Sequence, residues 1–149
     1  MPKVRDLLVR KSARGVPTDI VSIAPDATVL AAAQLMTARG IGGLLVLEGD
    51  ELVGIFTERD ILRRVVTAQR DPAATRVRDV MTSPVLAVSP DTLVAECRAL
   101  FTARRIRHLP VAGPDGLVGV MTSGDVLAFE SDEQRTTIEH LESYVYHNR

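Results

Sequence analysis

Two threonine–aspartate pairs with the same spacing are the residues best placed to do chemistry in this chain. Thr57 and Asp60 follow Gly-Ile-Phe, and Thr122 and Asp125 follow Gly-Val-Met, each pair directly ahead of another apolar segment. At the start of a helix, Thr-x-x-Asp can be a capping box, in which the hydroxyl and the carboxylate each accept a hydrogen bond from a backbone amide. This interpretation needs no ligand.

The same corner can also bind a nucleoside phosphate. A strand that runs straight into a helix leaves unpaired amides and partial positive charge, which attract a phosphate. A carboxylate one turn further on can accept hydrogen bonds from both hydroxyls of a ribose. An isolated corner favours the helix cap, and the presence of two equivalent corners favours a binding function.

No other group of residues predicts catalysis or metal binding. Cys97 falls on an apolar helical stripe, which predicts a buried thiol rather than a nucleophile. His108 has no partner nearby in the sequence, and no Cys/His group has metal-ligand spacing. The glycines of residues 40–43 precede a predicted strand rather than a helix, which excludes a dinucleotide-binding fingerprint.

The composition favours a globular protein with an aliphatic core. Hydrophobic residues make up 46% and charged residues 25%, so the chain is not disordered. A net charge of -1 and an aromatic content of 3% argue against binding to nucleic acid or to anionic membranes. The single cysteine suits a reducing compartment. No apolar segment resembles a signal peptide or approaches the roughly 20 residues of a membrane span. We therefore expect a cytoplasmic protein without membrane or nucleic-acid partners.

An internal repeat positions the two corners. Residues 25–63 overlay residues 90–128 without a gap, and nearly half of the aligned positions are identical. Upstream, Val-Arg-Asp-Leu-Leu at residues 4–8 matches Val-Arg-Asp-Val-Met at residues 77–81. The chain is therefore a duplication, in which each half is too small to bury its strands alone.

Each repeat predicts a strand, a helix, a hairpin and a second helix. In the first repeat these are a strand at 19–23, a helix from N-cap Asp26 to Arg39, a hairpin at 44–56 around Gly49-Asp50, and a helix at 58–69 with the apolar face Ile61, Leu62, Val65 and Val66. We expect a first repeat at 1–67, a polar linker at 68–76 and a second repeat at 77–130.

A tail at 131–149 follows the second repeat. Ser131 is its predicted N-cap, with Gln134 at the capping-box distance. Ile138, Leu141 and Val145 then form a narrow apolar stripe. The stripe predicts either a helix laid on the rest of the chain, which is the preferred interpretation, or a helix that forms a dimer.

The repeat unit resembles the CBS domain, here as the tandem pair called a Bateman module. The resemblance rests on Ile-Arg-His-Leu-Pro-Val at 106–111 and on the two corner segments, and it covers nearly the whole chain. Stand-alone bacterial CBS pairs, without a catalytic domain, are the most similar type. The resemblance implies an α/β (α+β) fold of two β-α-β-β-α repeats, packed as a pseudo-twofold pair, with a C-terminal helix added. It also implies two clefts for adenosine-containing ligands such as AMP, ADP, ATP, NAD(H) or S-adenosylmethionine, and commonly a disc-like homodimer.

The resemblance assigns roles to individual residues. Asp60 and Asp125 would hold ribose hydroxyls, and Thr57 and Thr122 would lie at the phosphate or ribose. The residues implied to line the adenine pocket are Thr18, Asp19 and Ile20 in one repeat and Ser83, Pro84 and Val85 in the other. The further phosphate candidates are Arg59, Arg107 and His108.

The two repeats differ around these corners. Arg107 and His108 of the second repeat align with Gly42 and Gly43 of the first, so the clefts should differ in charge and shape. One nucleotide per chain is therefore as plausible as two. An insert of eight residues, which contains Lys11, is expected to be a solvated loop, or else to add cations to the first cleft.

Three functions follow in order of preference. The first is a non-catalytic adenine-nucleotide sensor, in which a homodimer changes conformation and an unidentified protein partner reads the change. The second is a structural or dimerisation module whose corners are only helix caps. An enzyme is the weakest, because no nucleophile–base pair or metal site emerges.

Overall fold

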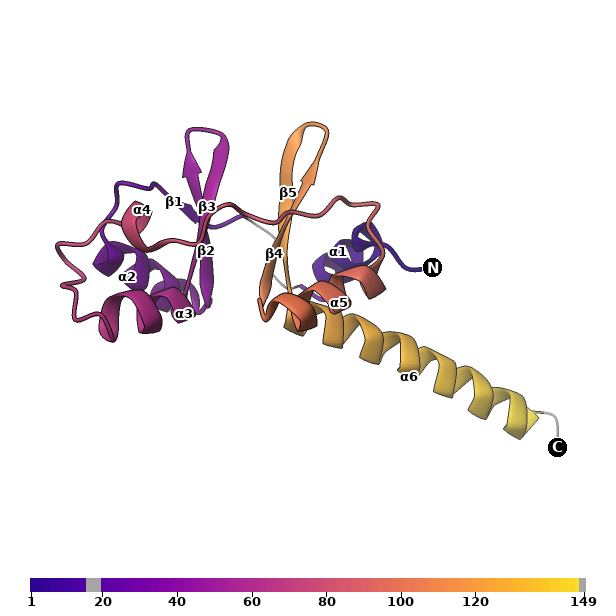
Figure 1. Ribbon diagram of the computed structural model, residues 1–149. Helices are drawn as coiled ribbons and strands as arrows, with labels where there is room; N and C mark the ends of the chain where they lie inside the picture. The colour runs from indigo at the N-terminus through magenta and orange to yellow at the C-terminus, as the bar shows by residue number, and fades with distance from the viewer. Residues whose placement is uncertain (16–19, 148–149) are drawn as a thin grey trace. The chain divides into compact units, whose positions relative to one another are not determined.

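The computed structural model describes residues 1–15 and 20–147, with side chains as far as Val145 (Figure 1). Contacts divide the chain into two compact units. The middle unit is Ile20–Leu86, and the terminal unit combines the N-terminal segment with the residues from Ala87 onward. The N-terminal helix of the first repeat therefore packs with the second repeat, and the helix that starts the second repeat packs with the first.

The middle unit is a small sheet covered by helices. Its elements are β1 (Ser22–Ile23), α2 (Val29–Arg39), β2 (Gly43–Glu48), β3 (Glu51–Thr57), α3 (Glu58–Asp60), the π-helix η1 (Ile61–Val66) and α4 (Val77–Val80). β1 is parallel to β2, and β2 and β3 form an antiparallel hairpin that begins at the pair Gly43–Thr57. The core residues are Val29, Ala32, Met36, Leu44, Val46, Phe56, Val65, Val77 and Val80.

The segment after α4 extends this sheet. Thr82 exchanges two backbone hydrogen bonds with Ile55, of 2.9 and 3.0 Å. Met81 lies against Gly54, where an added Cβ would be 2.4 Å from the Met81 sulfur. A side chain at position 54 would therefore force Met81 to move, and Thr82 is held beside the end of β3.

The terminal unit repeats the plan with fewer strand residues. It contains α1 (Val4–Ala13), α5 (Val94–Arg104), β4 (His108–Gly113), β5 (Gly116–Thr122) and α6 (Ser123–His147). A single parallel bridge between Val88 and Val111 replaces the pairing that β1 makes in the middle unit. The core residues are Val4, Leu7, Val88, Val94, Cys97, Phe101, Leu109, Val111, Met121, Val126 and Phe129.

The predicted mixed α/β fold and both hairpins are confirmed, whereas several local predictions are wrong. The N-cap of α2 is Thr28, whose hydroxyl accepts a hydrogen bond from the Ala31 amide at 3.1 Å. Asp26 instead binds Arg78, and this hydrogen bond and the charge of Asp26 raise the pKa of Arg78. Leu62 and Val66, predicted on an apolar packing face, are exposed.

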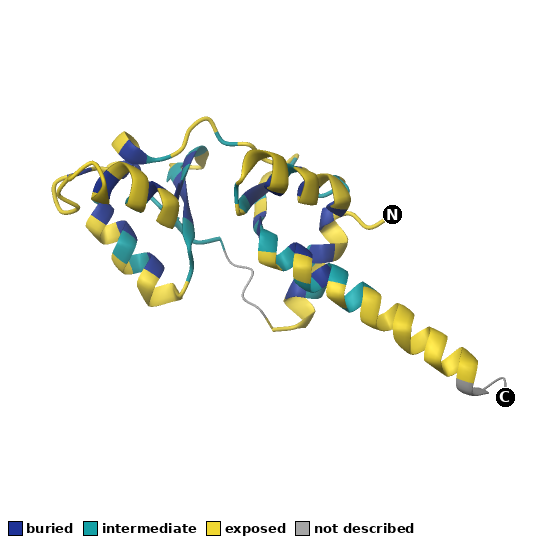
Figure 2. Ribbon diagram, turned by 60° about the horizontal axis from the view of Figure 1, so that its bottom comes forward, coloured by how far each residue is buried: buried dark blue, intermediate teal, exposed yellow. Residues whose placement is uncertain are grey.

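The third error concerns the tail. α6 is continuous from Ser123 to His147, so Ser131 lies inside a helix and does not cap a new one. Every side chain from Gln134 to Val145 is exposed, as the yellow C-terminal half of α6 shows (Figure 2). The favoured prediction, that the tail lies on the rest of the chain, is therefore wrong for this part of α6.

Candidate functional site

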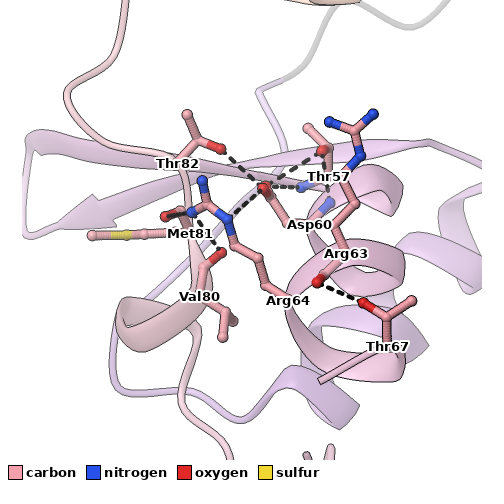
Figure 3. A network of polar contacts seen from close by, with 8 residues as sticks. All are labelled: Thr57, Asp60, Arg63, Arg64, Thr67, Val80, Met81 and Thr82. Carbon is pink, nitrogen blue, oxygen red and sulfur yellow. Dashed lines mark hydrogen bonds and ion pairs between the residues drawn. The ribbon is translucent and has the colours of Figure 1, made fainter. Parts of the chain in front are cut away.

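The first corner is the junction of β3 with α3 in the middle unit, and Figure 3 shows it from close by. Thr57 is the N-cap, and its amide donates to Asp60 Oδ2 at 3.0 Å while the Asp60 amide donates to Thr57 Oγ1 at 3.4 Å. The Thr57 hydroxyl also donates to Asp60 Oδ2, at 3.3 Å. The capping box predicted for Thr-x-x-Asp is therefore formed.

The Asp60 carboxylate has further partners from a distant part of the sequence. The Thr82 hydroxyl donates to Asp60 Oδ1 at 2.9 Å, and Arg64 Nε lies 3.9 Å from the same oxygen (Figure 3). Arg64 in turn donates to the carbonyls of Met81, at 2.7 Å, and Val80, at 3.3 Å. Asp60 is only 5% exposed. The network ties the start of the π-helix to the segment after α4.

The second corner, at the start of α6, has the same backbone geometry with a different partner. The Thr122 amide donates to Asp125 Oδ2 at 2.8 Å, and the Asp125 amide donates to Thr122 Oγ1 at 3.1 Å. Lys11 Nζ donates to Asp125 Oδ2 at 2.8 Å. Lys11 is in α1 and is buried, so the expectation of a solvated loop is wrong, and the corner it joins is the second.

The loop ahead of the hairpin borders each corner. The Glu58 amide donates to the Gly42 carbonyl at 3.0 Å, and the equivalent Ser123 amide donates to the Arg107 carbonyl at 3.1 Å. A Cβ on Gly42 would be 3.2 Å from Glu58 Oε1. The residue pair beside the first corner is therefore Gly42 and Glu58, and the equivalent pair beside the second corner is Arg107 and Ser123.

The other predicted site residues are distributed as follows. His108 pairs with Thr122 across the β4–β5 hairpin, so it adjoins the second corner. Arg59 is exposed within α3. Ile20 and Val85 are half-buried, whereas Ser83 and Pro84 are exposed and directly follow Thr82. Thr18 and Asp19 lie outside the described residues.

Three contact residues were not assigned to the corners that they join: Thr82, Arg64 and Lys11. The sequence did contain a signal for Lys11, because residues 4, 7 and 11 fall on one face of a helix, and Val4 and Leu7 on that face of α1 are buried. Thr82 and Arg64 carried no comparable signal, since their contacts depend on how α4 packs beside β3.

The described residues offer little for catalysis. Burial and the nearby Glu96 raise the pKa of the Cys97 thiol to about 11, which makes this thiol a poor nucleophile. Within residues 1–15 and 20–145, no three His, Cys, Asp or Glu side chains gather closely enough to hold a metal ion. In the described part of the chain, no helix is both long enough and apolar enough to cross a membrane.

Comparison with known proteins identifies the repeat. The CBS domain model matches residues 4–67 and again residues 77–132. The mitochondrial CBS domain-containing protein CBSX3 of Arabidopsis thaliana is 37% identical over 125 residues, which cover 80% of this chain and 61% of that protein. This chain therefore spans less than two thirds of the length of that relative.

Solved structures agree with the sequence match. A protein with CBS domains from Burkholderia ambifaria is 40% identical, with a TM-score of 0.78 over 84% of this chain and 90% of that one. CBSX2, solved in complex with AMP, is 22% identical, with a TM-score of 0.70 over 90% of this chain and 99% of that one, and at this identity it shows the fold alone. The chain belongs to the CBS-domain family, as a tandem pair of these domains.

Proposed function

We propose that this chain is a non-catalytic regulatory module that binds an adenosine phosphate through its Thr-x-x-Asp corners. The Asp60 carboxylate carries the proposal, because it is an ionisable group, 5% exposed, that neighbouring donors hold in one orientation. CBSX2, which shares this fold, has been solved in complex with AMP, so the fold can hold an adenosine ligand. AMP, ADP and ATP are the preferred candidates, and NAD(H) and S-adenosylmethionine remain in the test.

Ribose hydroxyls would take the place of the Thr82 hydroxyl on Asp60. Both are neutral donors to a carboxylate, and such bonds contribute about 1.5–3 kcal/mol each, so the exchange costs little. The phosphate would lie toward the start of α3, near Thr57 and Arg59, where the positive charge of the Arg59 guanidinium and the positive end of the helix dipole favour an anion. The adenine would then lie near Ser83 and Pro84.

This exchange gives a route from ligand to conformation. Thr82 belongs to the segment that leads on to Ala87 and the terminal unit, so releasing its hydroxyl frees one of the bonds that hold this segment beside β3. A ligand shifts such an equilibrium only through its different affinities for the two states. An unidentified protein partner would read the change.

Thermal unfolding with AMP, ADP, ATP, NAD, NADH and S-adenosylmethionine, each in turn, tests the proposal. A ligand at 100 times its dissociation constant adds about 2.7 kcal/mol. For a chain of this size the expected rise in Tm is roughly 5–10 °C. The variant carrying both Asp60→Asn and Asp125→Asn should lose the rise. No shift with any ligand would mean that the corners are helix caps only.

A second function, assembly, is favoured by the exposed stripe on α6. Ile138, Leu141 and Val145 are 54%, 61% and 50% exposed, at the alternating spacing of a coiled-coil seam. Arg135 and Glu142 flank this seam on one side, so two antiparallel copies would place each Arg135 beside the partner's Glu142. We propose a homodimer formed through this helix.

Sedimentation velocity tests the assembly. The wild-type chain should sediment as a dimer at micromolar concentration, and Ile138→Glu should make it a monomer, because a charge would enter an apolar seam. Ser143→Glu adds the same charge off the seam and should leave the dimer intact. A dimer that survives Ile138→Glu would exclude the helix as its interface.

A further inference from the structure

The two corner carboxylates differ in how many of their oxygens already accept a hydrogen bond. At the first corner, Asp60 Oδ2 accepts from the amide and the hydroxyl of Thr57. Asp60 Oδ1 accepts from the Thr82 hydroxyl at 2.9 Å, and Arg64 Nε lies 3.9 Å from the same oxygen. Both oxygens of Asp60 are therefore engaged within the middle unit.

At the second corner the hydrogen bonds fall on one oxygen. Asp125 Oδ2 accepts from the Thr122 amide and from Lys11 Nζ, each at 2.8 Å. Among the described residues, no donor is bonded to Asp125 Oδ1. Since none of their polar side-chain atoms is both buried and without a hydrogen bond, this oxygen reaches solvent. The Asp125 side chain is 13% exposed, against 7% for that of Asp60.

Lys11 fixes one oxygen of Asp125 and leaves the other open. Its ammonium group donates to Oδ2 and also lies 3.4 Å from the Val120 carbonyl of β5. A ribose hydroxyl that donates to Oδ1 would therefore break neither the ion pair nor the helix cap. The ion pair also holds the carboxylate in place before a ligand arrives, which lowers the cost of binding.

The residues beside the two corners also differ in charge. At the first corner the Glu58 carboxylate lies close to Gly42, where an added Cβ would be 3.2 Å from Oε1. Arg59 offsets the charge of Glu58. At the second corner the residues equivalent to Glu58 and Arg59 are uncharged, and Arg107 stands in place of Gly42. A phosphate is therefore better matched in charge at the second corner.

We propose that the second corner binds an adenosine phosphate more tightly than the first, with a ribose hydroxyl on Asp125 Oδ1, so that AMP fills the second corner first. This inference rests on the proposed function. At Asp60 a ribose hydroxyl replaces an existing bond from Thr82, whereas at Asp125 it adds a bond to a charged group. We expect the two dissociation constants for AMP to differ by about tenfold or more, which is the contribution of one such bond.

Equilibrium dialysis with radiolabelled AMP, over a range of concentrations wide enough to separate the two steps, tests the order of filling. The wild-type chain should bind two AMP in two steps. Asp60→Asn should remove only the weaker step, and Asp125→Asn should remove only the tighter one. A single AMP per chain that is lost in Asp125→Asn and kept in Asp60→Asn would support the same order.

A variant that keeps both carboxylates tests the reason for the difference. Thr82→Val retains the backbone hydrogen bonds to Ile55 and removes the hydroxyl on Asp60 Oδ1. The weaker step should then tighten by about tenfold. Thr67→Val, at the other end of η1, removes a hydroxyl that donates to the Arg63 carbonyl at 2.8 Å. This control should change neither step.

The results that would overturn the proposal differ from those that would overturn nucleotide binding. Two steps of equal affinity, loss of the tighter step in Asp60→Asn, or no tightening in Thr82→Val would overturn the order of the corners while leaving nucleotide binding in place. These three results come from chains with Asp125 intact, so they do not depend on how Asp125→Asn folds. No AMP bound by the wild type or any variant would instead overturn the proposed function.

Discussion

The ion pair between Lys11 and Asp125 should be strongly coupled in the stability of the folded chain. The two charges are 2.8 Å apart, and the side chains are 11% and 13% exposed. Removing one partner of a buried pair costs about 3–5 kcal/mol, whereas exposed pairs couple by only about 0.2–1 kcal/mol. Because some solvent reaches this pair, we place the cost of Asp125→Ala near the lower end, at about 3 kcal/mol.

The two single substitutions should not be equal. Asp125→Ala leaves a nearly buried ammonium group, whose other acceptor is the Val120 carbonyl at 3.4 Å, and also removes a helix cap. Lys11→Met leaves a carboxylate that keeps the Thr122 amide at 2.8 Å and the partial positive charge of the α6 N-terminus. We therefore expect Lys11→Met to cost about 1–2 kcal/mol.

A double-mutant cycle measures the coupling. With both side chains replaced, no charge is left unpaired, so the double variant should be no less stable than Asp125→Ala. The coupling energy between Lys11 and Asp125 should then be about 1–2 kcal/mol. Urea unfolding gives the free energies, and each kcal/mol corresponds to about 2–4 °C in Tm. Additive effects, with coupling below about 0.5 kcal/mol, would show that the pair is as weak as a surface ion pair and would refute the reasoning from burial.

Two further predictions concern packing and the thiol. Gly54→Ala should destabilise the chain by about 1–3 kcal/mol, because the added Cβ would be 2.4 Å from the Met81 sulfur. Gly119→Ala, at the equivalent position of the second repeat, should cost clearly less, because the nearest neighbour of its Cβ is Leu8 at 3.7 Å. Thermal unfolding compares the two variants, and equal losses of stability would contradict this account. The thiol of Cys97, with a pKa raised from 9.0 to about 11, should resist alkylation at pH 8 in the folded chain and react in urea. As the pH rises, the thiol ionises in the unfolded chain before it ionises in the folded chain. The stability that the neutral Cys97 thiol contributes should therefore be complete below pH 9.0 and decline as the pH rises toward 11. The Cys97→Ala variant should not show this decline.

The sequence predicted those features that depend on local patterns. The hairpin at Gly49-Asp50 and the capping boxes at Thr57 and Thr122 follow from turn and cap residues within a few positions of each other. The internal repeat predicted that the second corner would be equivalent to the first. The hairpin and the capping boxes are interactions whose partners are near neighbours in the chain.

The features that were missed depend on contacts between distant segments. Thr82 lies 22 residues from Asp60, and Lys11 lies 114 residues from Asp125. They meet because each repeat contributes its first helix to the other compact unit, an exchange that no local pattern encodes. The N-cap of α2 was missed for a smaller reason, since Asp26 and Thr28 are both good caps and only the latter reaches the amide of Ala31.

A crystal structure of the chain grown with AMP would test the central claim most directly. We expect the ribose hydroxyls within hydrogen-bond distance of the Asp60 carboxylate, in place of the Thr82 hydroxyl, with the phosphate near Thr57. The Lys11–Asp125 ion pair should be unchanged in the same crystal. AMP bound elsewhere, with the Thr82–Asp60 hydrogen bond intact, would contradict the assignment of the first corner as the nucleotide site.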